Sequence, residues 1–105
     1  MKHKLVRYKV RPEAVAENRR LIEGVFEALQ ATAPEDVSYM VLELEDGSFI
    51  HLKSDGTAGG FELGELPAFQ SFRRGIGERC EEAPQSREAR LVGGYRNGPR
   101  HVRAR

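Results

Sequence analysis

His51 is the residue of this chain best suited to acid–base chemistry. It stands in the short segment Phe49 to Lys53, whose residue types are typical of a strand. An imidazole titrates near neutral pH, so a histidine that faces a partly apolar cavity can act as an acid, a base or a ligand. The alternative is a hydrogen-bonded histidine at an interface, because only a positioned partner makes a pocket histidine chemically active.

Arg7 and Glu43 are two of the charged residues that we expect on the same surface as His51. Arg7 is predicted to be catalytic together with His51, since a guanidinium binds an anionic or phenolic oxygen well. Glu43 is predicted to orient the imidazole and to contact the substrate. The alternative is that Arg7 and Glu43 pair with each other, or that one of them forms an ion pair across a subunit interface.

Three further residues are predicted to bind the substrate. Tyr39 and Phe49 would supply flat apolar walls for an aromatic ligand, although both are equally suited to interface packing. Asn18 lies in the apolar stripe of a predicted helix, where a polar side chain needs a partner. It either fastens the helix to a backbone group or contacts the ligand.

Metal and nucleotide sites lack the sequence patterns that they need. His3, His51 and His101 lie far apart, and no Cys-x-x-Cys or His-x-x-x-His spacing is present. The glycines of residues 54–64 lack the Lys-Ser/Thr ending of a phosphate-binding loop. Cys80 falls on a buried helical stripe and is predicted to be an inert core thiol. We therefore expect no metal and no cofactor, although the sequence does not exclude a bound haem.

Composition limits the class of protein. The chain has 105 residues, which fits one domain, and 17 Lys and Arg against 16 Asp and Glu give a net charge of +1. Such a charge supplies no general attraction to nucleic acid or to an anionic membrane. The single cysteine and the absence of a long apolar run lead us to expect a cytoplasmic protein with no membrane partner.

The elements that must position these residues alternate in type along the chain. Period-two patterns predict four strands, and helical spacing predicts two helices, in the order β-α-β-β-α-β. The strands are predicted at 3–10, 37–45, 49–53 and 87–96, and the helices at about 12–31 and from Pro67 through Cys80, with Pro84 beyond the end. Asp46-Gly47 predicts a tight hairpin. The glycine-rich segment 54–64 is expected to be a loop that borders a site.

This order predicts an α+β domain of the ferredoxin-like kind over residues 1–96, with a four-stranded antiparallel sheet, followed by a basic tail at 97–105. We expect both helices to cover the more aliphatic face of the sheet. That face would consist of Val6, Tyr8, Val10, Met40, Leu42, Leu44, Ile50 and Leu52. The other face would carry Arg7, Lys9, Tyr39, Val41, Glu43, Phe49, His51 and Lys53, a mixture that suits a cavity or a dimer contact.

Three phrases of the sequence resemble members of the antibiotic biosynthesis monooxygenase-like family. They are Arg7-Tyr8-Lys9-Val10-Arg11-Pro12, Leu66-Pro67-Ala68-Phe69 and Val92-Gly93-Gly94-Tyr95, and the resemblance spans about residues 3 to 96. It implies a homodimer in which two sheets close face to face as a dimeric α+β barrel. Named members oxygenate aromatic polyketides or degrade haem. They commonly use an Asn on the first strand, a Trp and sometimes a His; this chain contains no Trp.

Three functions compete at this point. The first is cofactor-independent oxidation of an aromatic or quinone-like molecule in a cavity that the dimer encloses. The second is a non-catalytic dimeric domain that binds a small aromatic or hydrophobic molecule, because the fold does not fix the function. The third, disfavoured by the neutral charge, is an RNA-binding module, in which Phe49 and His51 would stack on bases.

Overall fold

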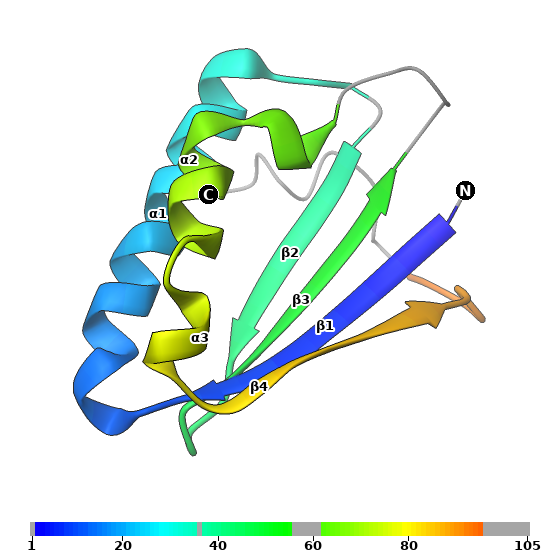
Figure 1. Ribbon diagram of the computed structural model, residues 1–105. Helices are drawn as coiled ribbons and strands as arrows, with labels where there is room; N and C mark the ends of the chain where they lie inside the picture. Colours follow the sequence, from blue (N-terminus) through cyan, green and yellow to red (C-terminus); the bar gives the residue numbers. More distant parts are fainter. Residues whose placement is uncertain (1, 36, 56–61, 96–105) are drawn as a thin grey trace.

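The computed structural model describes residues 2–35, 37–55 and 62–95. Four strands form one antiparallel sheet in the order β2-β3-β1-β4, and their bounds are β1 Lys2–Val10, β2 Val37–Glu43, β3 Ser48–Asp55 and β4 Cys80–Ala89. Three helices lie against one face of the sheet (Figure 1): α1 Val15–Thr32, α2 Pro67–Arg73 and α3 Ile76–Arg79. The predicted ferredoxin-like α+β fold is confirmed.

Helix α1 forms where its sequence has helical spacing of residues that become buried. Asn18, Ile22 and Val25 face the sheet and are at most 7% exposed. A short 3-10 turn, η1 (Pro12–Ala14), precedes the helix, and Pro12 fits there because its missing N–H would have no helical partner. The helix ends at Ala33, which takes a left-handed conformation with φ 51°. The predicted first helix is confirmed.

The β2–β3 hairpin turns at Asp46-Gly47, as its sequence predicts. An Asp46 carboxylate oxygen accepts a hydrogen bond from the backbone N–H of Ser48 at 2.9 Å. Gly47 has φ +90°, a conformation that strains residues with a side chain. The carbonyl of Gly47 also accepts the N–H of Val10 at 3.1 Å, so the turn is tied to the end of β1.

The sheet register contradicts the predicted sorting of the hairpin onto the two faces. Tyr8 pairs with Phe49, and Val6 pairs with His51, so these side chains share one face. That face lies under the helices, where Tyr8 and Phe49 are each 1% exposed and His51 is 6% exposed. The prediction was right for β1 and wrong for the hairpin. The face of β2 and β3 that was expected to be open packs against the helices, and the face that was expected under the helices is open. Large aromatic rings fill the space below the helices, and the polar tips among them bond to one another.

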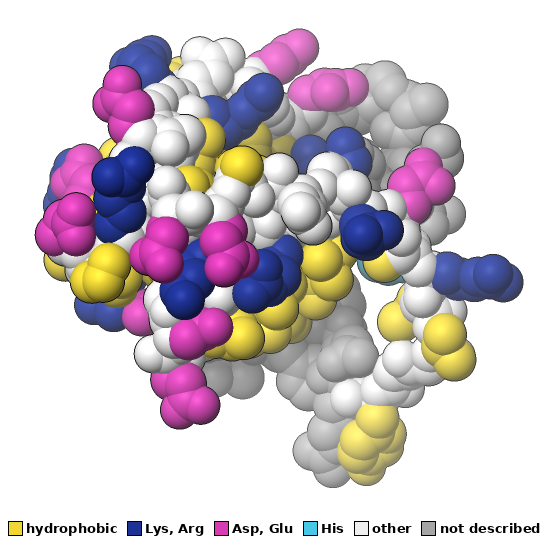
Figure 2. Space-filling view, turned by 60° about the horizontal axis from the view of Figure 1, so that its bottom comes forward, with side chains coloured by type: hydrophobic (Ala, Val, Ile, Leu, Met, Phe, Trp, Pro, Cys, Tyr) yellow, Lys and Arg dark blue, Asp and Glu magenta, His cyan; other side chains and the backbone are white. Residues whose placement is uncertain are grey.

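The aliphatic side chains of the hairpin consequently lie on the face without helices. Met40, Leu42 and Leu44 are 51%, 48% and 37% exposed. Met40 pairs with Leu52, which shares this face and is partly buried. Figure 2, a view from the end of the molecule that holds the hairpin, shows hydrophobic side chains in a band bordered by charged ones. An apolar surface of this kind is typical of an interaction site.

The last third of the described chain differs from the prediction. The predicted second helix ends at Arg73, because Gly75 takes φ +77°, and α3 is a separate short helix. Strand β4 then starts at Cys80 rather than at residue 87. Pro84 stands inside β4, which tolerates a proline because it is an edge strand with a shifted register against β1.

Two other predicted segments fall partly or wholly outside the described residues. The tail at 97–105 is outside them, so its separation from a domain at 1–96 stays a prediction. Of the expected loop 54–64, residues 56–61 are also outside. The described end of that segment contains a 3-10 turn, η2 (Leu63–Glu65), whose Leu63 is 1% exposed and joins the core.

Candidate functional site

His51 lies between two tyrosine hydroxyls beneath the helices. Its Nε2 atom is 2.7 Å from the hydroxyl oxygen of Tyr8, and its Nδ1 atom is 2.7 Å from that of Tyr39. The register places the three side chains together, since His51 stands on β3 with Val6 of β1 on one side and Val41 of β2 on the other. Each flanking strand supplies one tyrosine, two residues along from the paired position.

Two residues of the helices extend this cluster. Asn18 of α1 donates a hydrogen bond from Nδ2 to the Tyr8 hydroxyl at 2.9 Å. Arg79 of α3 donates from Nε to the Asn18 side-chain oxygen at 2.9 Å. The result is a continuous series of hydrogen bonds, which we call the polar chain: Arg79, Asn18, Tyr8, His51 and Tyr39.

Backbone groups at the break between α2 and α3 hold Arg79 in place. Its Nη2 atom donates to the carbonyl of Phe72 at 2.6 Å, and its Nη1 atom donates to the carbonyl of Arg74 at 3.2 Å. The guanidinium also lies over the Phe72 ring, 5.3 Å from its centroid. The helix break therefore has a structural role, since it frees the carbonyls that Arg79 needs.

Aromatic rings surround the polar chain. Tyr8 is stacked on Phe49, with ring centroids 5.6 Å apart, and the Phe72 ring lies 5.2 Å from His51. At the other end Tyr39 is stacked on Phe26 at 5.1 Å. Phe69 meets the edge of Tyr39 at 6.3 Å, completing an aromatic lining around that ring.

Burial keeps every member of the Tyr8–His51–Tyr39 group neutral at physiological pH. It lowers the pKa of His51 from its ordinary value of 6.5 to about 4, because a charged imidazole is poorly solvated there. The same loss of solvent raises the pKa of Tyr8 and that of Tyr39. A neutral imidazole donates one hydrogen bond and accepts one. It therefore accepts from one of the two phenols and donates to the other.

Only part of the predicted site is brought together. His51, Tyr39 and Asn18 meet in the polar chain, as a site requires. Phe49 is a core residue stacked on Tyr8, away from the open face where it was expected. Its burial and that of His51 also remove the surface on which stacking with RNA bases would depend.

Neither Arg7 nor Glu43 is hydrogen-bonded to His51. The predicted shared face was wrong for Arg7 and right for Glu43, which pairs with Phe49 on the face of His51. Arg7 stands on the opposite side of β1 from Tyr8 and pairs with Glu82 of β4 at 3.2 Å. Glu43 is at the end of β2, where Arg19 of α1 binds it through two hydrogen bonds of 3.0 and 2.8 Å. The two residues do not pair with each other.

Tyr8 and Arg79 are the site residues that the sequence analysis missed. Tyr8 was assigned to the core as an apolar residue, without regard to its hydroxyl. A buried phenol needs a hydrogen-bond partner, and the buried Asn18 needs one too. Because Tyr8 was predicted on the strand face that the helix covers, a hydrogen bond between Tyr8 and Asn18 could have been predicted. Arg79 carried no comparable signal, because its position depends on the unforeseen break at Gly75.

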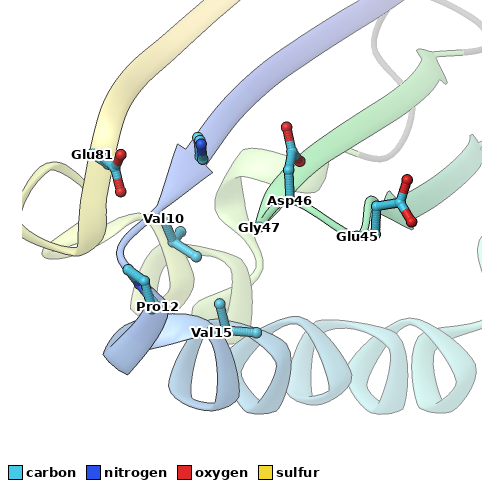
Figure 3. Close-up of a pocket in the computed structure, with 8 residues that line it drawn as sticks. Val10, Pro12, Val15, Glu45, Asp46, Gly47 and Glu81 are labelled. Atoms are coloured by element: carbon cyan, nitrogen blue, oxygen red, sulfur yellow. The ribbon is translucent and has the colours of Figure 1, made fainter.

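A cavity of about 390 Å³ opens at the hairpin end of the sheet, apart from the polar chain. Figure 3 shows Val10, Pro12 and Val15 on its α1 side and three carboxylates around it, with Glu81 coming from β4. The carboxylates of the hairpin are those of Glu45 and Asp46. Since the cavity includes no member of the polar chain, we place the candidate site at the chain rather than here.

No cluster of three or more His, Cys, Asp or Glu side chains among the described residues is arranged to hold a metal ion. Within the same residues, no helix is long and apolar enough to cross a membrane.

Comparison with known proteins relates the fold to one group of solved structures. No family model matches the chain, and no curated protein matches it. Three structures named "putative antibiotic biosynthesis monooxygenase" are similar to it. The one from Caulobacter crescentus has a TM-score of 0.71 at 16% identity, over 88% of this chain and 90% of that one.

The second, from Nitrosomonas europaea, has a TM-score of 0.72 at 12% identity, over 89% of this chain and 100% of that one. The third, from Bacteroides thetaiotaomicron, has a TM-score of 0.73 at 13% identity, over 87% of this chain and 89% of that one. The chain thus has the fold of the structures that carry the antibiotic biosynthesis monooxygenase name.

Proposed function

We propose that the protein is a monooxygenase-like enzyme that oxidises an aromatic or quinone-like small molecule with O₂ and without a bound cofactor. The observation that carries this proposal is the hydrogen-bonded Tyr8–His51–Tyr39 group, which is enclosed by aromatic rings between the sheet and the helices. The fold shared with structures named putative antibiotic biosynthesis monooxygenase supports it.

The substrate ring binds at the Tyr39 end of the polar chain. Tyr39 stands on the edge strand β2 and is only partly buried, whereas Tyr8 on the inner strand β1 is 1% exposed. Phe26 and Phe69 flank the Tyr39 ring and offer flat apolar surfaces to an aromatic molecule. A ligand therefore reaches the polar chain at the Tyr39 hydroxyl.

The polar chain acts on an oxygen atom of the substrate. Before it gives up electrons to O₂, the substrate loses a proton and negative charge builds on its oxygen; a positioned phenol O–H stabilises that charge in an environment with little water. His51, with a pKa of about 4, is a poor proton acceptor at neutral pH, so it orients the Tyr39 hydroxyl. One atom of O₂ enters the substrate as a carbonyl, and the other leaves as water with two substrate hydrogens, so the substrate itself supplies the electrons.

We also propose that the protein is a homodimer, joined through the sheet face that carries Met40, Leu42 and Leu44. This face is apolar and lacks a helix cover among the described residues. A stable interface buries about 800 Å² per subunit, for which one side of a four-stranded sheet is a suitable size. The polar chain lies on the other side of the sheet, so each subunit holds its own site, instead of a cavity enclosed by the dimer.

Oxygen uptake with a panel of phenols and hydroquinones tests this function. The background autoxidation of each compound is subtracted, and the wild type is compared with Tyr39→Phe, which removes only the hydroxyl. We expect a protein-dependent rate that Tyr39→Phe lowers by about 100- to 1,000-fold, the usual effect of removing one positioned donor. A surface control, Glu27→Gln on α1, retains the rate.

Two results would contradict the proposal: no rate above background for any compound, or an equal rate in Tyr39→Phe. Thermal stabilisation by a compound that is not turned over would instead select a non-catalytic binding domain with the same site.

A further inference from the structure

The polar chain has a direction, which begins at Arg79. A guanidinium has donors and no acceptor, so the atom of Asn18 that faces Arg79 Nε at 2.9 Å is the amide oxygen. The amide nitrogen of Asn18 consequently faces the Tyr8 hydroxyl at 2.9 Å and donates to it. The orientation of the Asn18 amide is thereby fixed by its partner.

The O–H group of Tyr8 has one available hydrogen-bond acceptor among the described residues. The oxygen accepts from Asn18, and among the described residues the only acceptor near it is His51 Nε2 at 2.7 Å. Tyr8 is 1% exposed, and an unpaired buried O–H costs about 1 to 3 kcal/mol. The hydroxyl therefore donates to His51 Nε2.

The proton of the neutral imidazole must then be on the other nitrogen. Nε2 accepts, so Nδ1 carries the hydrogen and donates it to the Tyr39 oxygen at 2.7 Å. The Tyr39 oxygen, once it has accepted this bond, has its own O–H left to donate. No acceptor for that O–H lies among the described residues.

We infer that Arg79 and Asn18 are positioning residues that set the tautomer of His51 and leave the Tyr39 hydroxyl as a hydrogen-bond donor for a bound molecule. The site then takes an aromatic ligand through an acceptor oxygen, such as the carbonyl of an aromatic ketone or quinone. The ligand class rests on the proposed function. The direction of the chain does not depend on the ligand: it rests on the hydrogen-bond geometry and on the neutral form of the buried imidazole.

Replacing Asn18 by Asp reverses the chain almost without a change of shape. A carboxylate accepts at both oxygens, so it pairs with Arg79 and accepts a hydrogen bond from the Tyr8 hydroxyl. The Tyr8 oxygen then accepts from His51 Nε2–H, and Nδ1 accepts the O–H of Tyr39. In this variant the Tyr39 oxygen presents lone pairs to a ligand.

Nitrogen–proton correlation spectra of the imidazole test the direction without any ligand. In the wild type at neutral pH, His51 is expected as the Nδ1–H tautomer, and in Asn18→Asp as the Nε2–H tautomer. The Nε2–H tautomer in the wild type would overturn the inference, as would an unchanged tautomer in Asn18→Asp. If that variant does not fold, Arg79→Met replaces it and is expected to give a mixture of both tautomers, because the Asn18 amide is then free to turn.

Two ligands of similar shape test the chemical class by calorimetry. 1-Tetralone only accepts hydrogen bonds, and 1-aminonaphthalene mainly donates them. The wild type is expected to bind 1-tetralone about 10-fold more tightly, the effect of one well-made hydrogen bond, and Asn18→Asp is expected to reverse the order. An equal preference in the two proteins would overturn the ligand class. Binding of neither compound would overturn the proposed function, while the tautomer result would still decide the direction of the chain.

Discussion

The Nε2 atom of His51 lies 2.7 Å from the hydroxyl oxygen of Tyr8, and this contact joins the two inner strands of the sheet beneath the helices. Both side chains are almost fully buried. In that environment each polar atom depends on the other for a hydrogen bond, so the contact contributes to folding as well as to the proposed chemistry.

The first prediction concerns the two tyrosines as a matched pair. Tyr8→Phe leaves two buried partners, Asn18 Nδ2 and His51 Nε2, without a bond, whereas Tyr39→Phe leaves only His51 Nδ1. At about 1 to 3 kcal/mol for each stranded group, Tyr8→Phe is expected to lower the free energy of unfolding more than Tyr39→Phe. Urea denaturation of both variants measures this order. A larger loss in Tyr39→Phe would contradict the assigned contacts.

The second prediction concerns acid. The pKa of His51 is about 4 in the folded protein and near its ordinary 6.5 when unfolded, so between these values the unfolded chain binds a proton that the folded chain does not. The free energy of unfolding therefore decreases as the pH is lowered from 6.5 to about 4, by about 3 kcal/mol in total. Above pH 6.5 the contribution is constant.

A His51→Gln variant isolates this part of the pH dependence. Glu43 and Asp46 also have lowered pKa values, through hydrogen bonds from Arg19 and from Ser48, and the stability they provide is lost at still lower pH. Their contribution is common to both proteins. As the pH drops below 6.5, the wild type should lose stability relative to His51→Gln; parallel curves would show that His51 is not buried as described.

The third prediction concerns the open face of the sheet. Leu42→Glu places a charge at the centre of the proposed dimer contact, and desolvating that charge disfavours association. Sedimentation equilibrium is expected to show dimers for the wild type and monomers for this variant. Glu27→Lys on α1 changes charge away from the sheet and should stay dimeric. A monomeric wild type would refute the dimer and leave the site inside each subunit intact.

The fourth prediction concerns Cys80, which is 7% exposed at the start of β4. Burial raises the pKa of its thiol, and a thiol reacts as the thiolate. Ellman's reagent is therefore expected to modify Cys80 slowly in buffer and quickly in urea. A second thiol at an exposed position of α1, made by Glu27→Cys, serves as the fast control. Equal rates for the two thiols would contradict the burial of Cys80.

Local patterns of the sequence predict much of the fold. The helical spacing of Val15, Ile22, Val25 and Leu29 predicts α1. Asp46-Gly47 predicts the hairpin with the pairing that the structure shows. Within the hairpin, even the grouping of side chains by face was correct. These features depend on neighbours in sequence, which is why the sequence alone predicts them.

The orientation of the hairpin depends on contacts between distant segments. Both of its faces are apolar, and period two does not say which one meets the helices, so a slip of one residue against β1 exchanges them. The polar groups of Tyr39 and His51 made their face look unsuitable for a core. Only together with Tyr8 and Asn18 are those groups satisfied, and this set was not recognised from the sequence.

Strand β4 was misplaced for a different reason. Eight of its ten positions are exposed in the subunit, so it shows no alternation of apolar residues. The position of Pro84 was interpreted as the end of a helix, although an edge strand accepts proline. The missed break at Gly75 extended the predicted helix through Arg79 and Cys80, which hid Arg79 as a member of the site.

A crystal structure of the protein grown with 1-tetralone tests the central claim most directly. The account predicts the ligand beside Tyr39, with its ring against the surrounding aromatic side chains and its carbonyl oxygen within hydrogen-bond distance of the Tyr39 hydroxyl. A ligand bound instead in the acid-lined cavity near Gly47, or on the open face of the sheet near Leu42, would contradict it.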